Sequence, residues 1–310
     1  MKKKVLITGV NGFIGQALWQ YLRKYKKSID VYGIARAKKS NHPNISVLDV
    51  LNPKKLEFYL NHLSPDYIFH LAGGRMNDFN TLVQSNIGTT KVLLTTLQRI
   101  KCRPAKIIIA GSVAEYGIPL KNSRGINERY VAKPLSNYGR VKLKQTKLSL
   151  KYASQDLPIV VARISNISGT NTPEQLAAGS FSKEIVSLEK GNKQGTLVTM
   201  NLKGRRDFLD IHDVCSALWC LAEHGKYGHI YNVCSAVPVI MEDILFKLIS
   251  FSKIIDVEIC ENENSGSESF DVIGSNAKLR KHTSWKQEIS LDESLRDTLK
   301  SWRKKLNGKR

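Results

Sequence analysis

The sequence of 310 residues lacks the features that mark several classes of protein. No apolar run reaches about 18 residues, so a transmembrane helix is not expected. Met1 and three lysines lead directly into an apolar strand pattern, and no secretory signal is expected. Repeats and low-complexity tracts are also missing. These absences indicate a globular protein without a membrane partner, and we expect it in the cytoplasm.

Cysteine is scarce and irregularly spaced. The number of cysteines is odd, and no two of them have the C-x-x-C spacing of redox or zinc sites. We expect reduced thiols, as in a cytoplasmic protein. The cysteines are Cys102, Cys215, Cys220, Cys234 and Cys260. Histidine, cysteine and aspartate form no cluster that indicates a metal site, and none is expected.

Acidic residues are few, with 27 Asp and Glu against 48 Lys and Arg, which gives a formal net charge of +21 at pH 7. Such an excess raises the encounter rate with anionic substrates, and it is also found in nucleic-acid-binding proteins. Here the basic residues are scattered over amphipathic helical patterns and form no nucleic-acid-binding motif. We therefore expect an anionic small-molecule partner and no functional nucleic-acid binding.

The sequence does contain a strand, a glycine turn and a helix in immediate succession. Lys4–Thr8 predicts a buried strand, and Phe13–Leu22 has a helical pattern. Glycine in the turn lets the backbone approach a pyrophosphate, whose charge is favoured at the helix N-terminus. The alternative is a tight turn without a ligand. The dinucleotide-binding residues predicted here are Gly9, Asn11, Gly12, Phe13, Ile14 and Gly15.

The end of the second predicted strand, Val31–Arg36, indicates which dinucleotide binds. NAD-binding proteins usually place a carboxylate there for the ribose 2′-hydroxyl, whereas this chain has Ala35 and Arg36. Arg36, with Lys38 and Lys39 close behind it, favours a 2′-phosphate. Solvated loop cations are the alternative. We predict that NADPH (NADP) is favoured over NADH (NAD).

Two further strand ends are candidates for the cofactor site. Asp49 follows the strand pattern Ile45–Leu48, and it either contacts the adenine edge or caps the next helix. The strand Tyr67–His70 runs into small residues, which let a cofactor lie against the backbone. His70 itself is interpreted as a packed histidine and not as a catalyst. The cofactor-binding residues predicted at these ends are Asp49, Val50, Leu71, Ala72 and Gly73.

A strand-end hydroxyl and a later helix supply candidate catalytic residues. The strand Ile107–Ser112 brings Ser112 to the carboxyl edge, where ligands bind in doubly wound folds. Tyr138 and Lys142 are four residues apart, so they share one helical face. A nearby ammonium lowers a tyrosine pKa from its ordinary value of about 10, and a serine hydroxyl stabilises charge on the substrate oxygen. The alternative is an exposed helix face without a role.

Together these motifs resemble the extended short-chain dehydrogenase/reductase family, whose members act on nucleotide sugars. The resemblance covers nearly the whole chain. Its landmarks are Thr8–Gly15, His70–Ala72, Asn86, Ser112 with Tyr116–Gly117, Tyr138 with Lys142, Arg163–Asn166, Arg206–Asp213 and Tyr231–Val233. Within the family, reductases of GDP-linked 4-keto-6-deoxy sugars are resembled most closely. The stretches that carry this are Gly111–Gly117, Gly225–Ser235 and Gly274–Trp285.

The resemblance implies roles for the matching residues. Tyr138 would be the catalytic acid and base, Lys142 would anchor the ribose and tune the tyrosine, and Ser112 would polarise the substrate carbonyl. Asn166 would contact the nucleotide sugar, and Arg206 would bind its diphosphate as a planar cation. Alternatively, Arg206 pairs with a neighbouring carboxylate. The two carboxylates in question are Asp207 and Asp210.

Two departures from the family pattern narrow the function. Sugar dehydratases carry an Asp-Glu pair after the hydroxyl residue, where this chain has Val113 and Ala114. Glu115 comes one place too late, so dehydration is not expected. Ser265–Glu268 aligns with a family Arg-Pro-Ser-Asp segment that holds the diphosphate, but the arginine is missing. The nucleotide of the substrate therefore stays open between GDP, dTDP and CDP.

We expect an α/β fold, with a doubly wound parallel sheet (Rossmann) and a smaller C-terminal substrate-binding lobe. Residues 1–168, rejoined by about 206–235, would bind the dinucleotide, and residues 169–205 and 236–310 would form the lobe. The resemblance implies NADPH-dependent reduction of the 4-keto group of a nucleotide-activated 4-keto-6-deoxyhexose. Alternatives are a 4-epimerase with tightly bound NAD and a non-catalytic cofactor sensor. It also implies a homodimer through the helix Asn86–Leu97 and the Tyr138 helix.

Overall fold

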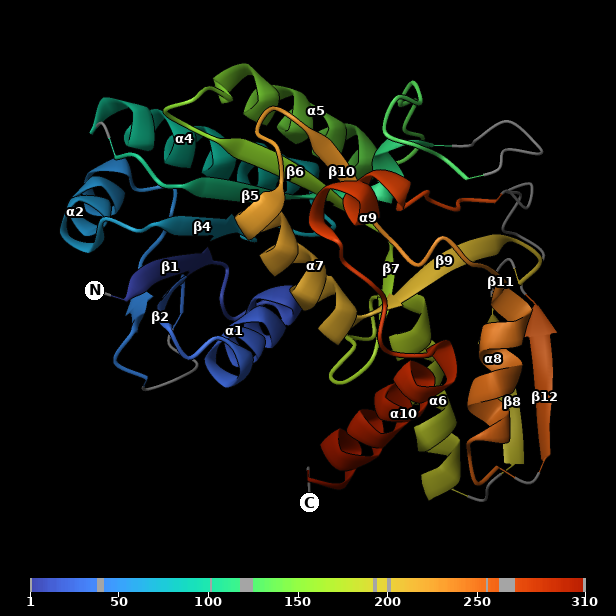
Figure 1. The fold of residues 1–310 in the computed structure, drawn as a ribbon. Coiled ribbons are helices and arrows are strands. Elements are labelled where there is room, and N and C mark those ends of the chain that lie inside the picture. The colour runs from blue at the N-terminus through green and yellow to red at the C-terminus, as the bar shows by residue number, and fades with distance from the viewer. Residues whose placement is uncertain are drawn as a thin grey trace.

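The fold is built around a parallel sheet in the strand order β10-β6-β5-β4-β1-β2-β3 (Figure 1). The computed structural model describes residues 2–37, 42–100, 102–117, 125–191, 194–199, 202–254, 256–261 and 271–308. The strands of the sheet are β1 (Lys3–Thr8), β2 (Ile29–Ala35), β3 (Ile45–Val47), β4 (Tyr67–His70), β5 (Lys106–Ser112), β6 (Ile159–Ile164) and β10 (Ile230–Val233). The order reverses between β1 and β4, and this confirms the predicted doubly wound α/β fold.

Helices cover both faces of the sheet, which is why its strands are apolar along nearly their whole length. One face packs against α1 (Phe13–Tyr25) and α7 (Ile211–His224). The other packs against α2 (Pro53–Leu63), α4 (Thr89–Arg99) and α5 (Asn137–Tyr152). The short helix α3 (Phe79–Val83) and a π-helical turn, Gln84–Gly88, precede α4. The predicted helix Asn86–Leu97 therefore begins inside that turn.

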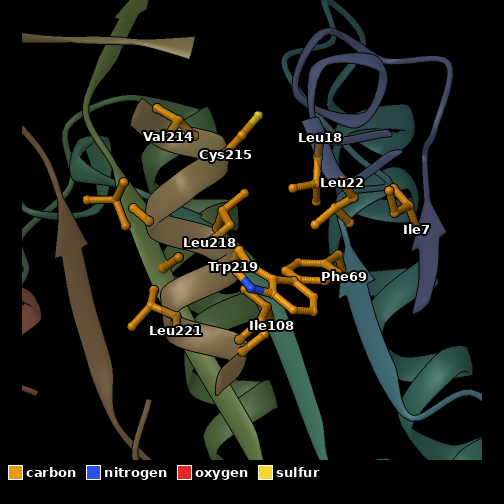
Figure 2. Close-up of a cluster of buried hydrophobic side chains, with 14 of the residues drawn as sticks. Ile7, Leu18, Leu22, Phe69, Ile108, Val214, Cys215, Leu218, Trp219 and Leu221 are labelled. Atoms are coloured by element: carbon orange, nitrogen blue, oxygen red, sulfur yellow. The ribbon is translucent and has the colours of Figure 1, made fainter. Parts of the chain in front are cut away.

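Trp219 of α7 is a large side chain in the first of these cores. Trp219 is buried, with 4% of its reference surface exposed. Figure 2 shows it lying beside Phe69 of β4 and Ile108 of β5. The rings of Trp219 and Phe69 are stacked, with centroids 6.4 Å apart. This contact joins α7 to the middle of the sheet.

A smaller set of elements lies at the lower right of Figure 1. A mixed sheet in the order β11-β9-β7 contains β7 (Asn166–Ser168), β9 (Arg205–Asp210) and β11 (Pro238–Ile240). A parallel pair is formed by β8 (Gln194–Thr199) and β12 (Asp256–Glu261). The helices α6 (Ala177–Lys190), α8 (Met241–Ser250) and α10 (Leu291–Asn307) enclose a separate apolar core. The helix α9 (Ala277–Thr283) packs on α7.

Replacing Trp219 with alanine should lower the free energy of unfolding by about 3–5 kcal/mol, because the cavity left behind cannot close fully. Urea denaturation followed by circular dichroism measures this loss. Phe246→Ala is the control, since that ring on α8 is 49% exposed and its removal should cost less than about 1 kcal/mol. Equal losses for the two variants would contradict the packing described here.

Candidate active site

A cavity of about 860 Å³ opens at the carboxyl ends of β1, β4, β5 and β6. The parallel registers bring these ends level, because Thr8 pairs with His70 and Ser112 pairs with Ile164. Its size is that of pockets that hold a cofactor or a comparable ligand. The predicted site residues that line it are Gly12, Phe13, Ile14, Gly15, Leu71, Ala72, Gly73, Ser112, Tyr138, Lys142, Asn166 and Arg206.

The glycine turn forms one wall of the cavity. Gly9 has φ +72°, and a Cβ there would lie 2.7 Å from the amide nitrogen of Ala72. A Cβ on Gly15 would lie 2.2 Å from the carbonyl oxygen of Gly9, so the helix can approach the turn only without a side chain. Gly12 is the N-cap of α1, and it supplies no side-chain cap. The start of α1 therefore fits a phosphate group that accepts hydrogen bonds from backbone amides.

Five of the predicted cofactor residues do not line this cavity, namely Gly9, Asn11, Arg36, Asp49 and Val50. Asn11 Nδ2 donates to the carbonyl oxygen of Ala37 at 2.7 Å, which ties the glycine turn to the segment after β2. Arg36 is exposed at the end of β2. Lys38 and Lys39 lie outside the described residues.

Asp49 and Val50 follow β3, and neither of them caps α2. The Asp49 carboxylate accepts a hydrogen bond from the Leu51 amide at 3.0 Å. The N-cap of α2 is Asn52, whose side chain accepts from the Lys55 amide at 3.0 Å, so the capping alternative for Asp49 is wrong. Val50 is buried in the core between the sheet and α2.

Ser112 and Tyr138 lie together in the cavity wall. Ser112 ends β5, and Tyr138 lies in the first turn of α5, which is capped by the Ser136 hydroxyl. Burial raises the pKa of Tyr138, while the Arg75 guanidinium and a hydrogen bond with Ser112 act in the opposite direction. The Arg75 guanidinium lies 5.1 Å from the centre of the Tyr138 ring.

Arg75 is a site residue that the sequence did not reveal. It lines the cavity after Gly73 and Gly74, in a loop held by Asn86. The Asn86 side chain accepts from the Gly74 amide at 3.1 Å and donates to the Gly74 carbonyl at 3.0 Å. No motif distinguished this arginine from the many others in a basic chain. Its place above the phenol depends on the loop geometry.

Lys142 is buried one helical turn after Tyr138 on α5, and it lines the cavity. Its Nζ donates to the carbonyl oxygen of Ala110 and to Oε1 of Gln145, each at 2.5 Å. Burial lowers the pKa of Lys142 to about 8, and the charge of Glu115 opposes that shift. Gln145 is a second residue of the site that no motif indicated.

Glu115 lies in a 3₁₀ turn, Val113–Glu115, and points away from the cavity. One of its oxygens accepts from the Ser112 amide at 2.9 Å, and the other accepts from Arg163 Nε at 2.8 Å. Both side chains of the ion pair are buried. The carboxylate therefore closes the turn and is not presented to a substrate.

Charges on the cavity wall are all positive. Among the described residues that line it there is no Asp or Glu, while Arg75, Lys142 and Arg206 are present. Val113 and Ala114 line it at the place where dehydratases of the resembled family carry two acids. The described part of the wall is therefore suited to anionic ligands and includes no carboxylate of the kind that elimination requires.

Asn166 of β7 and Arg206 of β9 also line the cavity. Asn166 Nδ2 donates to the carbonyl oxygen of Asp207 at 3.0 Å. The Asp207 carboxylate accepts from Ser235 and Ala236, and Asp210 caps α7 while it accepts from Ser294. A guanidinium nitrogen of Arg206 donates to the carbonyl oxygen of Arg205 at 2.9 Å. The aligned segment Ser265–Glu268 lies outside the described residues.

His70 is fully buried, as expected for a packed histidine. Burial lowers its pKa to about 3, so the imidazole is neutral at physiological pH. All five cysteines are free thiols. The described part of the chain contains no helix long and apolar enough to cross a membrane. It also contains no group of three or more His, Cys, Asp or Glu placed to hold a metal ion.

Comparisons with known proteins show which sequences and structures this chain is similar to. A model of the NAD dependent epimerase/dehydratase family matches residues 5–234. The GDP-6-deoxy-D-mannose reductase of Pseudomonas aeruginosa is 28% identical, over 97% of this chain and 98% of the relative. The GDP-6-deoxy-D-talose 4-dehydrogenase of Aggregatibacter actinomycetemcomitans is 25% identical, over 84% and 83% respectively. The structure of RMD from Pseudomonas aeruginosa complexed with NADPH has a TM-score of 0.85 at 26% identity, over 98% of this chain and 100% of the other.

Glu115→Ala should lower the free energy of unfolding by about 3–5 kcal/mol, because it leaves the Arg163 charge buried without its partner. The double variant Glu115→Ala/Arg163→Met removes both charges and should regain most of that loss. Chemical denaturation of the two variants and the wild type measures the difference. A double variant no more stable than Glu115→Ala would contradict this account of the pair.

Proposed function

The chain belongs to the NAD dependent epimerase/dehydratase family, and we propose that it reduces the 4-keto group of a nucleotide-activated 4-keto-6-deoxyhexose with NADPH. The single observation that carries this proposal is the cavity wall. It joins a glycine turn suited to a pyrophosphate with a Ser112–Tyr138–Lys142 group, and it has cations but no carboxylate among its described residues. Two relatives named for GDP-6-deoxyhexoses support this substrate class.

The chain's own residues would act on the ketone oxygen. The Tyr138 hydroxyl donates its proton to that oxygen as negative charge develops, and the Ser112 hydroxyl donates a hydrogen bond to the same atom. Lys142 holds the ribose beside Tyr138, and Arg75 keeps positive charge above the phenol. NADPH, when bound, supplies the hydride. Arg206 binds the diphosphate of the sugar nucleotide, and Asn166 contacts the nucleotide sugar.

We further propose the division into domains that the sequence predicts. Residues 1–168, rejoined by about 206–235, bind the dinucleotide, and residues 169–205 and 236–310 form the substrate-binding lobe. The cavity lining supports this division, because Gly12–Gly15 contribute from the first part while Gln175, Leu176 and Val272 contribute from the second.

The decisive assay incubates the protein with GDP- and dTDP-linked 4-keto-6-deoxyhexoses and follows NADPH absorbance, with sugar products identified by NMR. Oxidation of NADPH together with reduction at C4 supports the proposal. Interconversion of C4 epimers without net oxidation of NADPH would identify a 4-epimerase instead. Cofactor binding without turnover of any sugar nucleotide would favour the non-catalytic sensor.

Tyr138→Phe should lower turnover at least about a hundredfold, since a positioned proton donor contributes roughly that much. Affinity for NADPH, measured by its fluorescence, should stay unchanged, because the phenol ring remains in place. Tyr227→Phe is the matched control, as that ring lies 46% exposed before β10 and should leave turnover as it is. Full activity of Tyr138→Phe would refute its role as proton donor.

Arg36→Ala should weaken NADPH about ten- to hundredfold and leave NADH nearly unaffected, since a charged hydrogen bond contributes about 1.5–3 kcal/mol. Michaelis constants for both cofactors test this in the wild type and the variant. Arg23→Ala on α1 serves as the control, because it removes another cation without touching the end of β2. A wild type that prefers NADH would overturn the predicted cofactor preference.

Added salt should strengthen association of the proposed homodimer, whose interface is formed by α4 and α5. The two helices contain no Asp or Glu. Across the proposed interface, their exposed cations would therefore face the cations of the same two helices in the partner. Those cations are Lys91, Arg140, Lys144, Lys147 and Lys151, whereas the exposed Arg99 of α4 is paired with Glu57. Screening weakens this repulsion, so sedimentation from about 0.05 to 0.5 M salt should show growing dimer.

Lys144→Glu should favour the dimer at low salt, whereas Lys300→Glu on α10 should not. A monomer under all these conditions would contradict the proposed interface. A dimer that salt weakens would also contradict it.

A further inference from the structure

A continuous chain of buried polar groups connects Lys142 to the strand that leads into the glycine turn. Lys142 Nζ donates to Oε1 of Gln145 at 2.5 Å, and Gln145 Nε2 donates to the Thr90 hydroxyl at 2.8 Å. The Thr90 oxygen lies 3.0 Å from Nε2 of His70, whose Nδ1 lies 2.8 Å from the Thr8 hydroxyl. Every member is buried.

The donor and the acceptor of each hydrogen bond in this chain of polar groups can be assigned by counting hydrogens. The Thr90 hydroxyl donates to the carbonyl oxygen of Asn86 at 2.7 Å, so its lone pairs accept from Gln145 and from His70. His70 therefore carries its proton on Nε2, and its Nδ1 accepts from Thr8. A neutral imidazole is required by this pattern, in agreement with its lowered pKa. The carbonyl oxygen of Gln145 is thereby fixed toward the lysine.

The same chain reaches the wall of the cofactor cavity. The Thr8 oxygen accepts from the amide of Ala72 at 3.3 Å, and Ala72 lines the cavity. Lys142 sits at the other end, with a third ammonium hydrogen left over from its bonds to Ala110 and Gln145. Both ends of this chain of polar groups therefore lie at the same cavity.

We propose that Gln145 is a positioning residue that holds the Lys142 ammonium at the cofactor cavity in fixed relation to the glycine turn, an assignment that rests on the proposed function. An amide is suited to this task because it accepts a hydrogen bond without carrying charge. A carboxylate at this position would cancel the positive charge that the site needs. A hydrocarbon side chain would leave the ammonium without one of its acceptors.

Three other titratable groups face Lys142, and none of them replaces Gln145 as its acceptor. Glu115 faces it from the 3₁₀ turn, but that carboxylate is paired with Arg163 of β6. His70 faces it from β4 and is neutral. Tyr138, one turn earlier on α5, is a neutral phenol with a raised pKa. An ammonium held only by neutral acceptors responds strongly to a change in either acceptor.

The test measures NADPH affinity by fluorescence between pH 6.5 and 10, in the wild type, Gln145→Glu and Gln145→Leu. Wild-type affinity should fall as pH rises through the pKa of Lys142, which lies at about 8. Gln145→Glu should move this midpoint up by about one pH unit or more, because a carboxylate favours the ammonium. Gln145→Leu should move it down by about as much and weaken NADPH about tenfold at pH 7.

Two further variants make the result specific. Lys142→Met should abolish the pH dependence, which assigns the midpoint to Lys142. Thr146→Val changes the adjacent buried residue, whose hydroxyl has no hydrogen-bond partner in the described structure, and should leave midpoint and affinity unchanged. Circular dichroism melts establish that each variant is folded.

Shifts of the midpoint in opposite directions support the assignment, because a general loss of packing would move both variants the same way. Shifts in the same direction, or no shift, would overturn it. The measurement needs no sugar, so an inactive protein that shows the opposite shifts would refute the proposed reaction alone. A wild type that binds neither NADPH nor NADH would refute both.

Discussion

The parallel pairing of β1, β4, β5 and β6 is the constraint on which the site depends. Parallel neighbours must be joined by crossovers, so every strand ends at the same edge and every following helix starts there. The glycine turn leaves β1 at that edge, Ala72 follows β4, and Ser112 ends β5. Thus residues more than a hundred positions apart line one cavity. A shift of register in any of these strands would separate them.

The second requirement concerns charge. Buried charges behind the cavity wall must be compensated, while the positive charge on the cavity wall must be kept. Glu115 and Arg163 neutralise each other behind the wall, where an unpaired charge would be costly. Lys142 is held by two neutral acceptors and keeps its charge for a ligand. Arg75 and Arg206 add positive charge nearer to solvent. The site is thereby preorganised for anionic ligands, in keeping with the excess of cations in the whole chain.

Much of this arrangement could be predicted from the sequence, because its signals are local. The glycine turn, the strand ends and the Tyr138–Lys142 spacing each depend on a few neighbouring residues, and they predicted the fold class and ten of the residues that line the cavity. Arg75, Gln145 and the partner of Glu115 could not be predicted in this way. Gln145 and Thr90 are 55 positions apart, and Glu115 and Arg163 are 48 apart.

Local alternatives near strand ends were also hard to separate by sequence alone. Both Asp49 and Asn52 are good helix caps, and only the chain path after β3 selects Asn52. The helix predicted over Asn86–Leu97 has a regular apolar pattern, yet it begins inside a π-helical turn, in which the Asn86 side chain bonds with Gly74. Such details depend on packing against distant elements and not on propensity.

A crystal structure of the protein with NADPH tests the central claim most directly. The account predicts the pyrophosphate at the amides of Phe13 and Ile14, and the nicotinamide ring between Ser112 and Lys142 with the Tyr138 hydroxyl beside it. A dinucleotide bound away from the glycine turn, or a nicotinamide out of reach of that hydroxyl, would contradict it.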